Sequence, residues 1–204
     1  MISSKYIENA VNEMASLPGV GKRTALRYVL ELAGRSESEV EDFVKALQEL
    51  KTHIKTCARC HNLSDSEICN ICSNQNRESK VLCIVEDIRD VMAIEATHQY
   101  KGLYHVLGGK ISPMDGIGPA DLNIGTLVER MKTENIEELI LALSATMEGD
   151  TTAYFIFRKL DKLGEFKITT LSRGVPVGDE LQYTDEVTLG RSIVQRTPYD
   201  KSLQ

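Results

Sequence analysis

The first 56 residues carry the apolar spacing of three helices. Apolar side chains recur every three to four positions over residues 4–15, which predicts a first helix. Residues 17–21 (Leu-Pro-Gly-Val-Gly) end it, because proline and glycine do not continue a helix. A second helix is predicted over residues 23–33. Ser36 and Glu39 form a capping box that opens a third helix, whose apolar face holds Val40, Phe43, Val44, Leu47, Leu50 and Ile54.

Beyond residue 80 the spacing changes, and short apolar runs alternate with helical patterns. The apolar runs predict buried strands, at residues 80–86, 103–107, 138–143 and 167–171. The segments between them predict helices, at residues 88–95, 122–131 and 151–163, and a long loop at residues 108–119. Because strand and helix alternate, we expect an α/β domain with a mainly parallel sheet.

The last thirty or so residues contain few apolar side chains. They include the sequence Gly174-Val-Pro-Val-Gly178 and a short helical pattern at residues 192–196. So few apolar residues do not form a core by themselves. We therefore expect this tail to pack on the α/β domain or on a neighbouring subunit.

Two Cys-x-x-Cys pairs stand between the helical and the α/β segments, and they contain Cys57, Cys60, Cys69 and Cys72. A redox pair or two disulfides are alternatives, but neither explains two identical pairs so close together. Four thiolates at this spacing favour zinc, a softer ion than magnesium or calcium. With all four positions filled by sulfur, the zinc is predicted to be structural. His61 is expected to be a solvated loop residue.

The net charge of −6 argues against a nucleic-acid partner until its distribution is considered. Residues 1–56 carry equal numbers of basic and acidic side chains, and the whole acidic excess lies in residues 81–204. Residues 17–30 contain three basic side chains and no acid. No run of eighteen apolar residues occurs, and the first residues lack the charged segment followed by an apolar segment that is typical of a signal peptide. We expect a soluble cytoplasmic protein, associated with the nucleoid and not with a membrane, whose thiols are kept reduced.

The basic stretch, residues 17–25, resembles a helix-hairpin-helix. Gly19 and Gly21 would let backbone N–H groups approach a DNA phosphate at the positive end of the second helix. Arg23 and Arg27 lie on one face of that helix, and Lys22 adds a third positive charge. The sequence from Gly21 to Thr24 is similar to the end of a Walker phosphate loop. That motif needs a glycine where Ser16 stands, and it needs a preceding strand instead of a helix.

In parallel sheets, ligand-binding and catalytic residues gather at the carboxyl ends of the strands. Glu86 ends the first predicted strand, and Glu148-Gly-Asp150 follows the third. This arrangement resembles the Toprim fold, in which a glutamate and an Asp-x-Asp motif hold magnesium. Glu148 stands where the motif has its first aspartate, so the resemblance implies weak magnesium binding or partner docking at Glu86, Glu148 and Asp150, not catalysis.

Taken in order, these modules resemble the RecR family of bacterial recombination mediators. The most specific phrases are Cys69-Asn-Ile-Cys72, Ser112-Pro-Met-Asp-Gly-Ile-Gly-Pro119, Thr146-Met-Glu-Gly-Asp-Thr-Thr-Ala153 and Gly174-Val-Pro-Val-Gly-Asp-Glu-Leu181. The family hairpin usually reads Gly-Pro-Lys-Ser-Ala-x-Arg. Arg23 and Arg27 therefore match its DNA-contacting Lys and Arg, whereas Lys22 replaces a proline. The resemblance divides the chain into a helix-hairpin-helix region (1–56), a C4 zinc finger (57–72), a Toprim domain (80–175) and an oligomerisation tail (176–204).

The resemblance implies a DNA-binding mediator without enzymatic activity, built as a ring-shaped clamp of up to four subunits. Such a clamp acts with RecO and RecF to load the recombinase onto gapped single-stranded DNA in recombinational repair. A magnesium-dependent Toprim nuclease or phosphotransferase is the alternative, with Glu86 activating a nucleophile and Asp150 holding the metal. A protein scaffold that touches DNA only incidentally is a third reading.

Overall fold

The structure is a computed structural model that describes residues 4–178, 180–196 and 198. The chain divides into two compact units, Met1–Ile54 and Lys55–Gln204, and each is described by itself. Within the described residues, no helix is long and apolar enough to cross a membrane.

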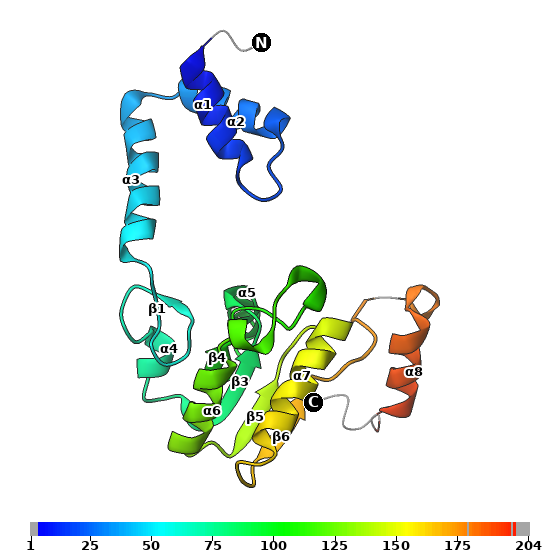
Figure 1. Ribbon diagram of the computed structural model, residues 1–204. Helices are drawn as coiled ribbons and strands as arrows, with labels where there is room; N and C mark the ends of the chain where they lie inside the picture. The colour runs from blue at the N-terminus through cyan, green and yellow to red at the C-terminus, as the bar shows by residue number, and fades with distance from the viewer. Residues whose placement is uncertain (1–3, 179, 197, 199–204) are drawn as a thin grey trace. The chain divides into compact units, whose positions relative to one another are not determined.

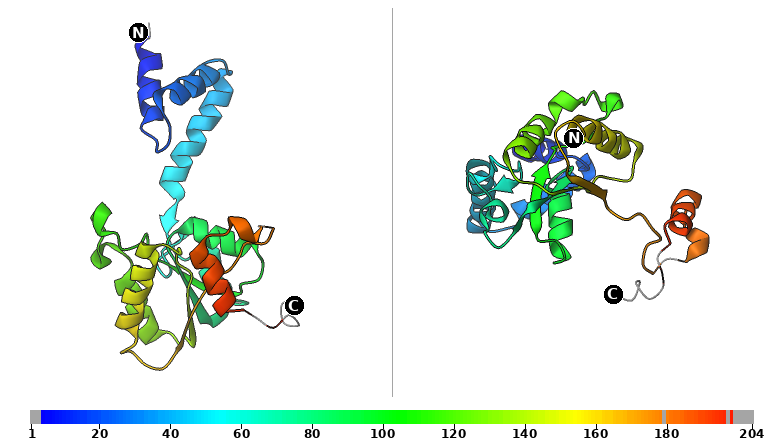
Figure 2. Two further views of the ribbon diagram at one scale, coloured as in Figure 1. Left: turned by 90° about the vertical axis from the view of Figure 1, so that its right-hand side faces the viewer. Right: turned by 90° about the horizontal axis from the view of Figure 1, so that it is seen from below.

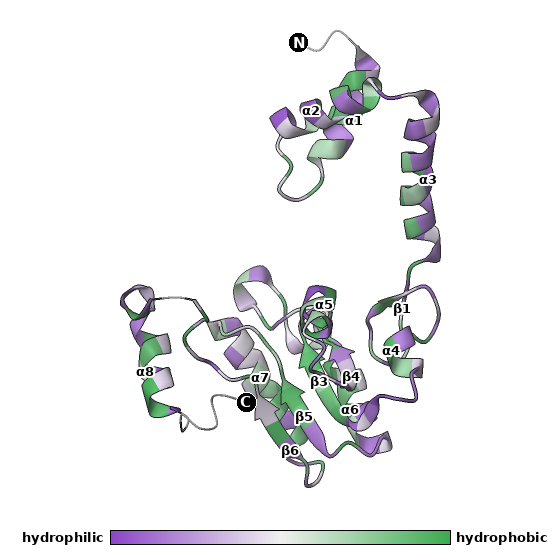
Figure 3. Ribbon diagram, turned by 180° about the vertical axis from the view of Figure 1, so that it is seen from behind, coloured by the Kyte–Doolittle hydropathy of each residue, from purple (hydrophilic) through white to green (hydrophobic). Residues whose placement is uncertain are grey.

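The first unit contains helices α1 (Lys5–Ala15), α2 (Lys22–Ala33) and α3 (Glu37–His53). Helices α1 and α2 pack on each other around the buried side chains of Val11, Ala25 and Val29. The predicted capping box of α3 is confirmed, because the Glu39 N–H donates to Ser36 Oγ and the Ser36 N–H donates to the Glu39 carboxylate. None of the described residues of α3 is buried, and its apolar face stands out in Figure 3.

The second unit opens with the four-cysteine segment. Strands β1 (Lys55–Thr56) and β2 (Leu63–Ser64) pair antiparallel, and the short helix α4 (Asn70–Ser73) follows. The two turns that hold the cysteine pairs lie next to this small ribbon.

A four-stranded parallel sheet is the centre of the second unit (Figure 1). Its strands run in the order β4 (Gly102–Val106), β3 (Glu78–Val85), β5 (Glu138–Leu141) and β6 (Lys167–Thr170). Helices α6 (Ile124–Thr133) and α7 (Met147–Leu160) cover one face, and α5 (Ile88–Ala96) covers the other (Figure 2). The α/β prediction is therefore confirmed.

The alternation of side chains along β3 explains these two layers. Leu82 and Ile84 point to the α6 and α7 side, in a core that includes Leu127 and Ile156. The alternating residues Cys83 and Val85 point to the α5 side, where they pack with Val91 and Tyr104. Both faces of the strand are thus buried, as its continuous apolar run predicts.

Two helices begin several residues earlier than the sequence pattern predicts. Helix α7 begins at Met147 instead of residue 151, because the Thr146 hydroxyl caps it by accepting from the Gly149 N–H at 3.2 Å. In the tail, α8 spans Glu186–Val194, whereas the pattern predicts residues 192–196. Asp185 is its cap and accepts from the Thr188 N–H at 2.9 Å. The described residues also form short 3-10 helices, η1 (Pro113–Asp115), η2 (Pro119–Asp121) and η3 (Leu181–Tyr183).

Candidate functional site

The four cysteines of the two Cys-x-x-Cys pairs converge on one point. All are buried, and their Sγ atoms lie within 4.8 Å of one another. Cys60 Sγ and Cys69 Sγ are 3.6 Å apart, close to the edge of about 3.8 Å expected for a tetrahedron with Zn–S bonds of about 2.3 Å. The residues present therefore fit a zinc ion held by Cys57, Cys60, Cys69 and Cys72.

Electrostatics also favour a cation among these thiols. Burial raises the pKa of the Cys57 thiol, but backbone N–H groups of Cys69 and Cys60 point at its sulfur and bring the pKa down to about 7. The pKa of Cys60 is raised, first by the Cys72 side chain and then by burial. Burial also raises the pKa of Cys69, to about 11. Without a cation, at least two of the sulfurs therefore keep their protons at neutral pH, and zinc binding must release them.

An ion-pair network fastens the first cysteine pair to helix α6. Arg59 lies between Cys57 and Cys60, and its guanidinium makes two hydrogen bonds to the carboxylate of Glu134, at 3.0 and 2.9 Å. Arg130, buried on α6, donates to the same carboxylate at 3.0 Å and to the Tyr104 carbonyl at 2.7 Å. Because bidentate pairs of this kind fix geometry, the zinc segment is held rigidly on the sheet unit.

His61 is part of the same junction: it lies in a loop, as expected, but it is half-buried and not fully solvated. Its backbone is in the left-handed region, with φ at 63°. Its ring lies 2.8 Å from the Thr126 hydroxyl and packs edge-on against the ring of His105, with centroids 5.2 Å apart. The Val106 N–H donates to the Cys60 carbonyl at 2.8 Å. The cysteine segment therefore contacts both β4 and α6.

The helix-hairpin-helix glycines occupy a turn with an open surface. Gly19 has φ at 79°, a conformation that favours glycine. Gly21 caps α2 without a side chain, and a Cβ built on it would meet no described atom within 4 Å. The first turn of α2 contains no acidic residue. The N–H groups at the positive end of this helix are thus accessible to an anion.

Arg23 and Arg27 extend this surface along α2. Both are exposed, and neither takes part in a salt bridge among the described residues. They line an open groove of about 630 Å³ together with Thr24, Leu26, Leu30 and Glu31. Lys22 is exposed at the start of the helix. The structure therefore places the three predicted DNA-binding cations along one helix, next to its glycine-capped N-terminus.

The three predicted Toprim acids lie at the carboxyl edge of the sheet, but they do not converge. Among the described residues, only the four cysteines form a set of three or more ligand atoms within 4.8 Å of one another. Glu86 follows β3, whereas Glu148 and Asp150 lie in the first turn of α7. The early start of α7 turns the Glu-Gly-Asp sequence from a loop into a helix.

The glycine of this sequence is required by close packing. A Cβ at Gly149 would lie 2.0 Å from the backbone oxygen of Ser144, a distance that no side chain tolerates. The first turn of α7 therefore packs directly on the segment that follows β5.

Sequence reasoning missed two cations at this edge, Lys110 and Arg173. Lys110 follows β4, and its Nζ lies 3.4 Å from Ser144 Oγ and 3.3 Å from Thr146 Oγ1. Arg173 follows β6 and forms an ion pair with Asp150. The signal was available, since the rule that selects Glu86 also applies to the residues that follow β4 and β6.

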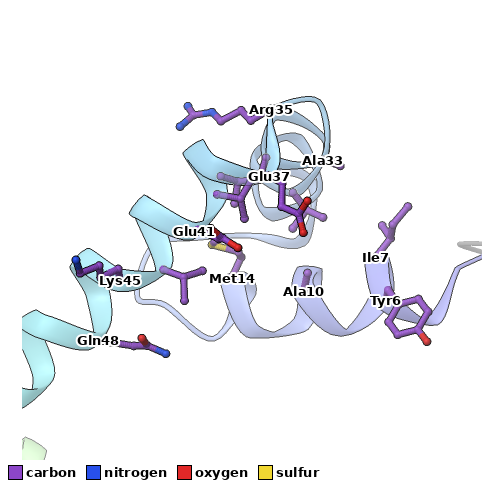
Figure 4. A pocket seen from close by; sticks show the side chains of 14 residues that line it. Tyr6, Ile7, Ala10, Met14, Ala33, Arg35, Glu37, Glu41, Lys45 and Gln48 are labelled. Carbon is purple, nitrogen blue, oxygen red and sulfur yellow. The ribbon is translucent and has the colours of Figure 1, made fainter.

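A second groove runs between α1, α2 and α3 in the first unit (Figure 4). It has a volume of about 820 Å³, and its walls are mainly apolar, with Ile7, Ala10, Met14, Leu32, Val40 and Val44. The apolar face of α3 continues from it, and Leu47 and Leu50 are 51% and 58% exposed. Surfaces of this kind mark sites of protein association.

Four family models match successive parts of the chain. They describe a RecR helix-hairpin-helix at residues 7–51, a RecR zinc finger domain with four cysteines at 54–74, a Toprim domain at 80–172 and a RecR C-terminal region at 174–197. A curated protein of Flavobacterium johnsoniae, called recombination protein RecR, is 54% identical over 202 residues, which span 99% of this chain and 98% of the relative. The chain belongs to the RecR family.

Other members of the RecR family are similarly close. Recombination protein RecR of Phocaeicola vulgatus is 59% identical over 194 residues (95% of this chain and 94% of the relative). The protein of the same name from Bacteroides fragilis is 57% identical over 196 residues (96% and 95%). The recognition of this family from the order of the modules is confirmed.

Family membership also confirms the metal centre. The RecR zinc finger model covers the four cysteines that the structure brings together. The prediction of a structural zinc at Cys57, Cys60, Cys69 and Cys72 is therefore supported by sequence spacing, by geometry and by the family model.

Proposed function

We propose that this member of the RecR family is a DNA-binding recombination mediator in DNA repair. The observation that carries the proposal is the surface of α2, where Arg23 and Arg27 form no ion pair with any described residue and adjoin a glycine-capped helix start. The matched helix-hairpin-helix region contains this surface. Guanidinium groups and free N–H groups together bind phosphate oxygens without reading bases.

The proposed DNA contact depends on salt. Each phosphate neutralised by a cation releases condensed counterions, so the logarithm of the affinity falls by about 0.7 to 0.9 per contact for each unit of log salt concentration. Lys22, Arg23 and Arg27 supply three contacts per subunit at most. Several subunits around one DNA molecule would multiply this number, which favours an assembly over a monomer.

We further propose that the assembly is a ring-shaped clamp, with two to four subunits. The apolar groove between α1, α2 and α3 supports a second copy of the chain as its occupant. Helix α3 is amphipathic over its whole length and buries no described residue within its own unit, so a matching apolar helix is the chemistry that covers it. Helix α8 likewise buries none of its residues and offers Val187, Ile193 and Val194 for a second contact.

In this proposal the clamp acts with RecO and RecF to load the recombinase onto gapped single-stranded DNA. The Toprim acids Glu86, Glu148 and Asp150 would then face a partner or stabilise the fold, and the protein would have no nuclease activity. Membership in a family of recombination proteins supports this role.

The decisive experiment removes the two arginines together. Zinc-loaded Arg23→Ala/Arg27→Ala protein and unmodified protein are titrated into end-labelled gapped DNA with Mg²⁺, and each mixture is run on native and denaturing gels. We expect the double variant to lose retention of the DNA by about tenfold or more, since two phosphate contacts disappear, while its zinc content stays the same.

A charge-matched variant makes the result specific. Lys101→Ala/Lys162→Ala removes two exposed lysines from the other unit and should bind DNA as the unmodified protein does. Equal retention by the arginine variant and the unmodified protein would remove α2 from the DNA interface. Metal-dependent cleavage on the denaturing gel, lost in Glu86→Ala, would replace the mediator by a Toprim nuclease.

A further inference from the structure

The carboxyl edge of the sheet collects one group from each of the four strands. Glu86 follows β3, Lys110 follows β4, Ser144 follows β5 and Arg173 follows β6. Parallel strands place their carboxyl ends at the same edge, so these residues are neighbours although they are distant in sequence. Two of the four are cations, which is unusual for an edge that is expected to bind a divalent metal.

Each of the three acids already has a partner within the chain. The Ser144 N–H donates to Glu86 Oε1 at 2.7 Å. Arg173 forms an ion pair with Asp150, and its hydrogen bond holds the pKa of that carboxyl below its usual range. Hydrogen bonds from its own backbone N–H and from the Thr146 hydroxyl lower the pKa of Glu148. The Ser144 N–H and the Arg173 guanidinium thus engage oxygens of Glu86 and Asp150 that a magnesium ion would otherwise take as ligands.

The loop after β4 holds Lys110 at the same edge of the sheet. The Ile111 N–H, next to it, donates to the buried hydroxyl of Thr152 on α7 at 2.9 Å. The ammonium group of Lys110 then lies beside Ser144 Oγ and Thr146 Oγ1. The positive charge of Lys110 also lowers the pKa of Glu148, whereas the negative charge of Asp115 raises it. The ammonium group of Lys110 thus lies between the segment that follows β5 and the N-cap of α7.

The remaining charged groups around Glu86 are satisfied locally. The N–H groups of Glu86 and Asp87 both donate to Asp90 Oδ2 at 3.0 Å. The Asp87 carboxylate pairs with Arg89. Asp115 accepts from the Ser112 hydroxyl at 2.6 Å. Lys110 acts on the charge of Glu148, and Arg173, with a smaller contribution from Arg191, acts on that of Asp150. Together Lys110 and Arg173 carry the same charge as one magnesium ion.

We propose that Lys110 and Arg173 supply at this edge the positive charge that a divalent cation supplies in metal-binding Toprim domains, so that the edge of this protein works without magnesium. The residues do not fit a magnesium ion, since the three acids do not converge, Asp150 is paired with Arg173, and the Lys110 ammonium lies at the same edge beside Ser144 and Thr146. Electrostatic repulsion by Lys110 and Arg173 disfavours a divalent ion at the same position.

The test measures manganese binding to the zinc-loaded, full-length protein by electron paramagnetic resonance of free Mn²⁺. The unmodified protein should show no saturable binding below about 1 mM, the weak limit of dedicated divalent sites. Lys110→Met keeps the length of the side chain and removes its charge. This variant should bind Mn²⁺ at least about tenfold more tightly than the unmodified protein, and adding Glu86→Gln should abolish the gain.

Two further variants keep the proposal open to refutation. Lys101→Met removes an exposed lysine of the same unit and should bind no Mn²⁺. Arg173→Gln tests the second cation independently, in case Lys110→Met does not fold. Saturable sub-millimolar binding to the unmodified protein, reduced by Glu86→Gln, would overturn the proposal. So would folded Lys110→Met and Arg173→Gln proteins that bind Mn²⁺ no better than Lys101→Met.

Discussion

Arg59 and Glu134 are 75 residues apart in sequence, and they form a bidentate ion pair with N···O distances of 3.0 and 2.9 Å. Arg59 lies inside the first cysteine pair, and Glu134 caps the end of α6. The pair therefore connects the metal centre to the sheet domain by side chains as well as by the backbone. It makes the zinc finger and the Toprim domain one structural unit.

Replacing Glu134 by glutamine should weaken both parts of this unit. The neutral amide would lack the charge that faces Arg59 and the buried Arg130, so we expect a loss of about 1–2 kcal/mol in the free energy of unfolding. Zinc should also pass faster to a chromophoric chelator, since Arg59 no longer holds its turn. Glu129→Gln on the same helix removes an exposed pair with Lys132 and should change neither quantity. Equal behaviour of the two variants would contradict the connection.

Burial of His105 should make the protein less stable in mild acid. The side chain is fully buried, its Nε2 donates to the Asn123 carbonyl at 2.8 Å, and burial lowers its pKa to about 4. Between pH 6.5 and 4, His105 is protonated in the unfolded chain but stays neutral in the folded chain. Stability therefore falls as the pH falls through this range, by up to about 1.4 kcal/mol per pH unit.

The measurement is chemical denaturation of unmodified and His105→Gln protein at several pH values. The glutamine variant is expected to be less stable at pH 7.5 but to lose less stability between pH 6.5 and 5. Parallel curves for the two proteins would show that another group causes the acid sensitivity. The four cysteines are the same in both proteins, so proton-driven loss of zinc contributes equally.

Gly149→Ala should be strongly destabilising. Its Cβ would lie 2.0 Å from the Ser144 oxygen, so either the start of α7 or the end of the β5 segment must move. We expect a cost of about 2–4 kcal/mol, measured by thermal or chemical unfolding. Gly125→Ala on α6 is the matched control. Its Cβ meets no described atom within 4 Å, and the change should stabilise the protein by about 0.5 kcal/mol.

Leu47→Asp should dissociate the proposed assembly. Leu47 lies on the apolar face of α3 and is 51% exposed, so the fold of one subunit does not require it. Burying an aspartate against a second copy costs several kcal/mol, and sedimentation velocity should show a smaller mass. Thr52→Asp adds the same charge to an exposed position on a different side of α3. An unchanged mass for Leu47→Asp would place the subunit contact elsewhere.

Local sequence patterns were sufficient for most elements and for the zinc site. The capping box at Ser36 and the cysteine spacing involve residues within a few positions of one another, and the structure has them as predicted. The strands of the sheet are also apparent from their apolar runs. These features depend on short-range geometry, which the order of residues largely determines.

The errors come from two caps and from contacts between distant segments. The predicted helix begins at residue 151 and leaves Gly149 outside it, yet α7 includes Gly149, where close packing on Ser144 requires a glycine. The pair of Arg59 with Glu134 leaves no trace in local patterns. The position of Arg173 after a strand places it at the sheet edge but does not reveal its pair with Asp150. They arise only when parallel strands and their crossover helices bring separate segments to one edge or face.

The hydroxyl group of Thr152 connects the long segment between β4 and α6 to helix α7. It accepts from the Ile111 N–H at 2.9 Å and donates to the Glu148 carbonyl at 2.7 Å, and it is fully buried. The Ile111 amide is thus protected as deeply as a core amide, although it belongs to no strand or helix. Exposing it to solvent requires the local unfolding of α7, so this part of the segment and the helix belong to one cooperative unit.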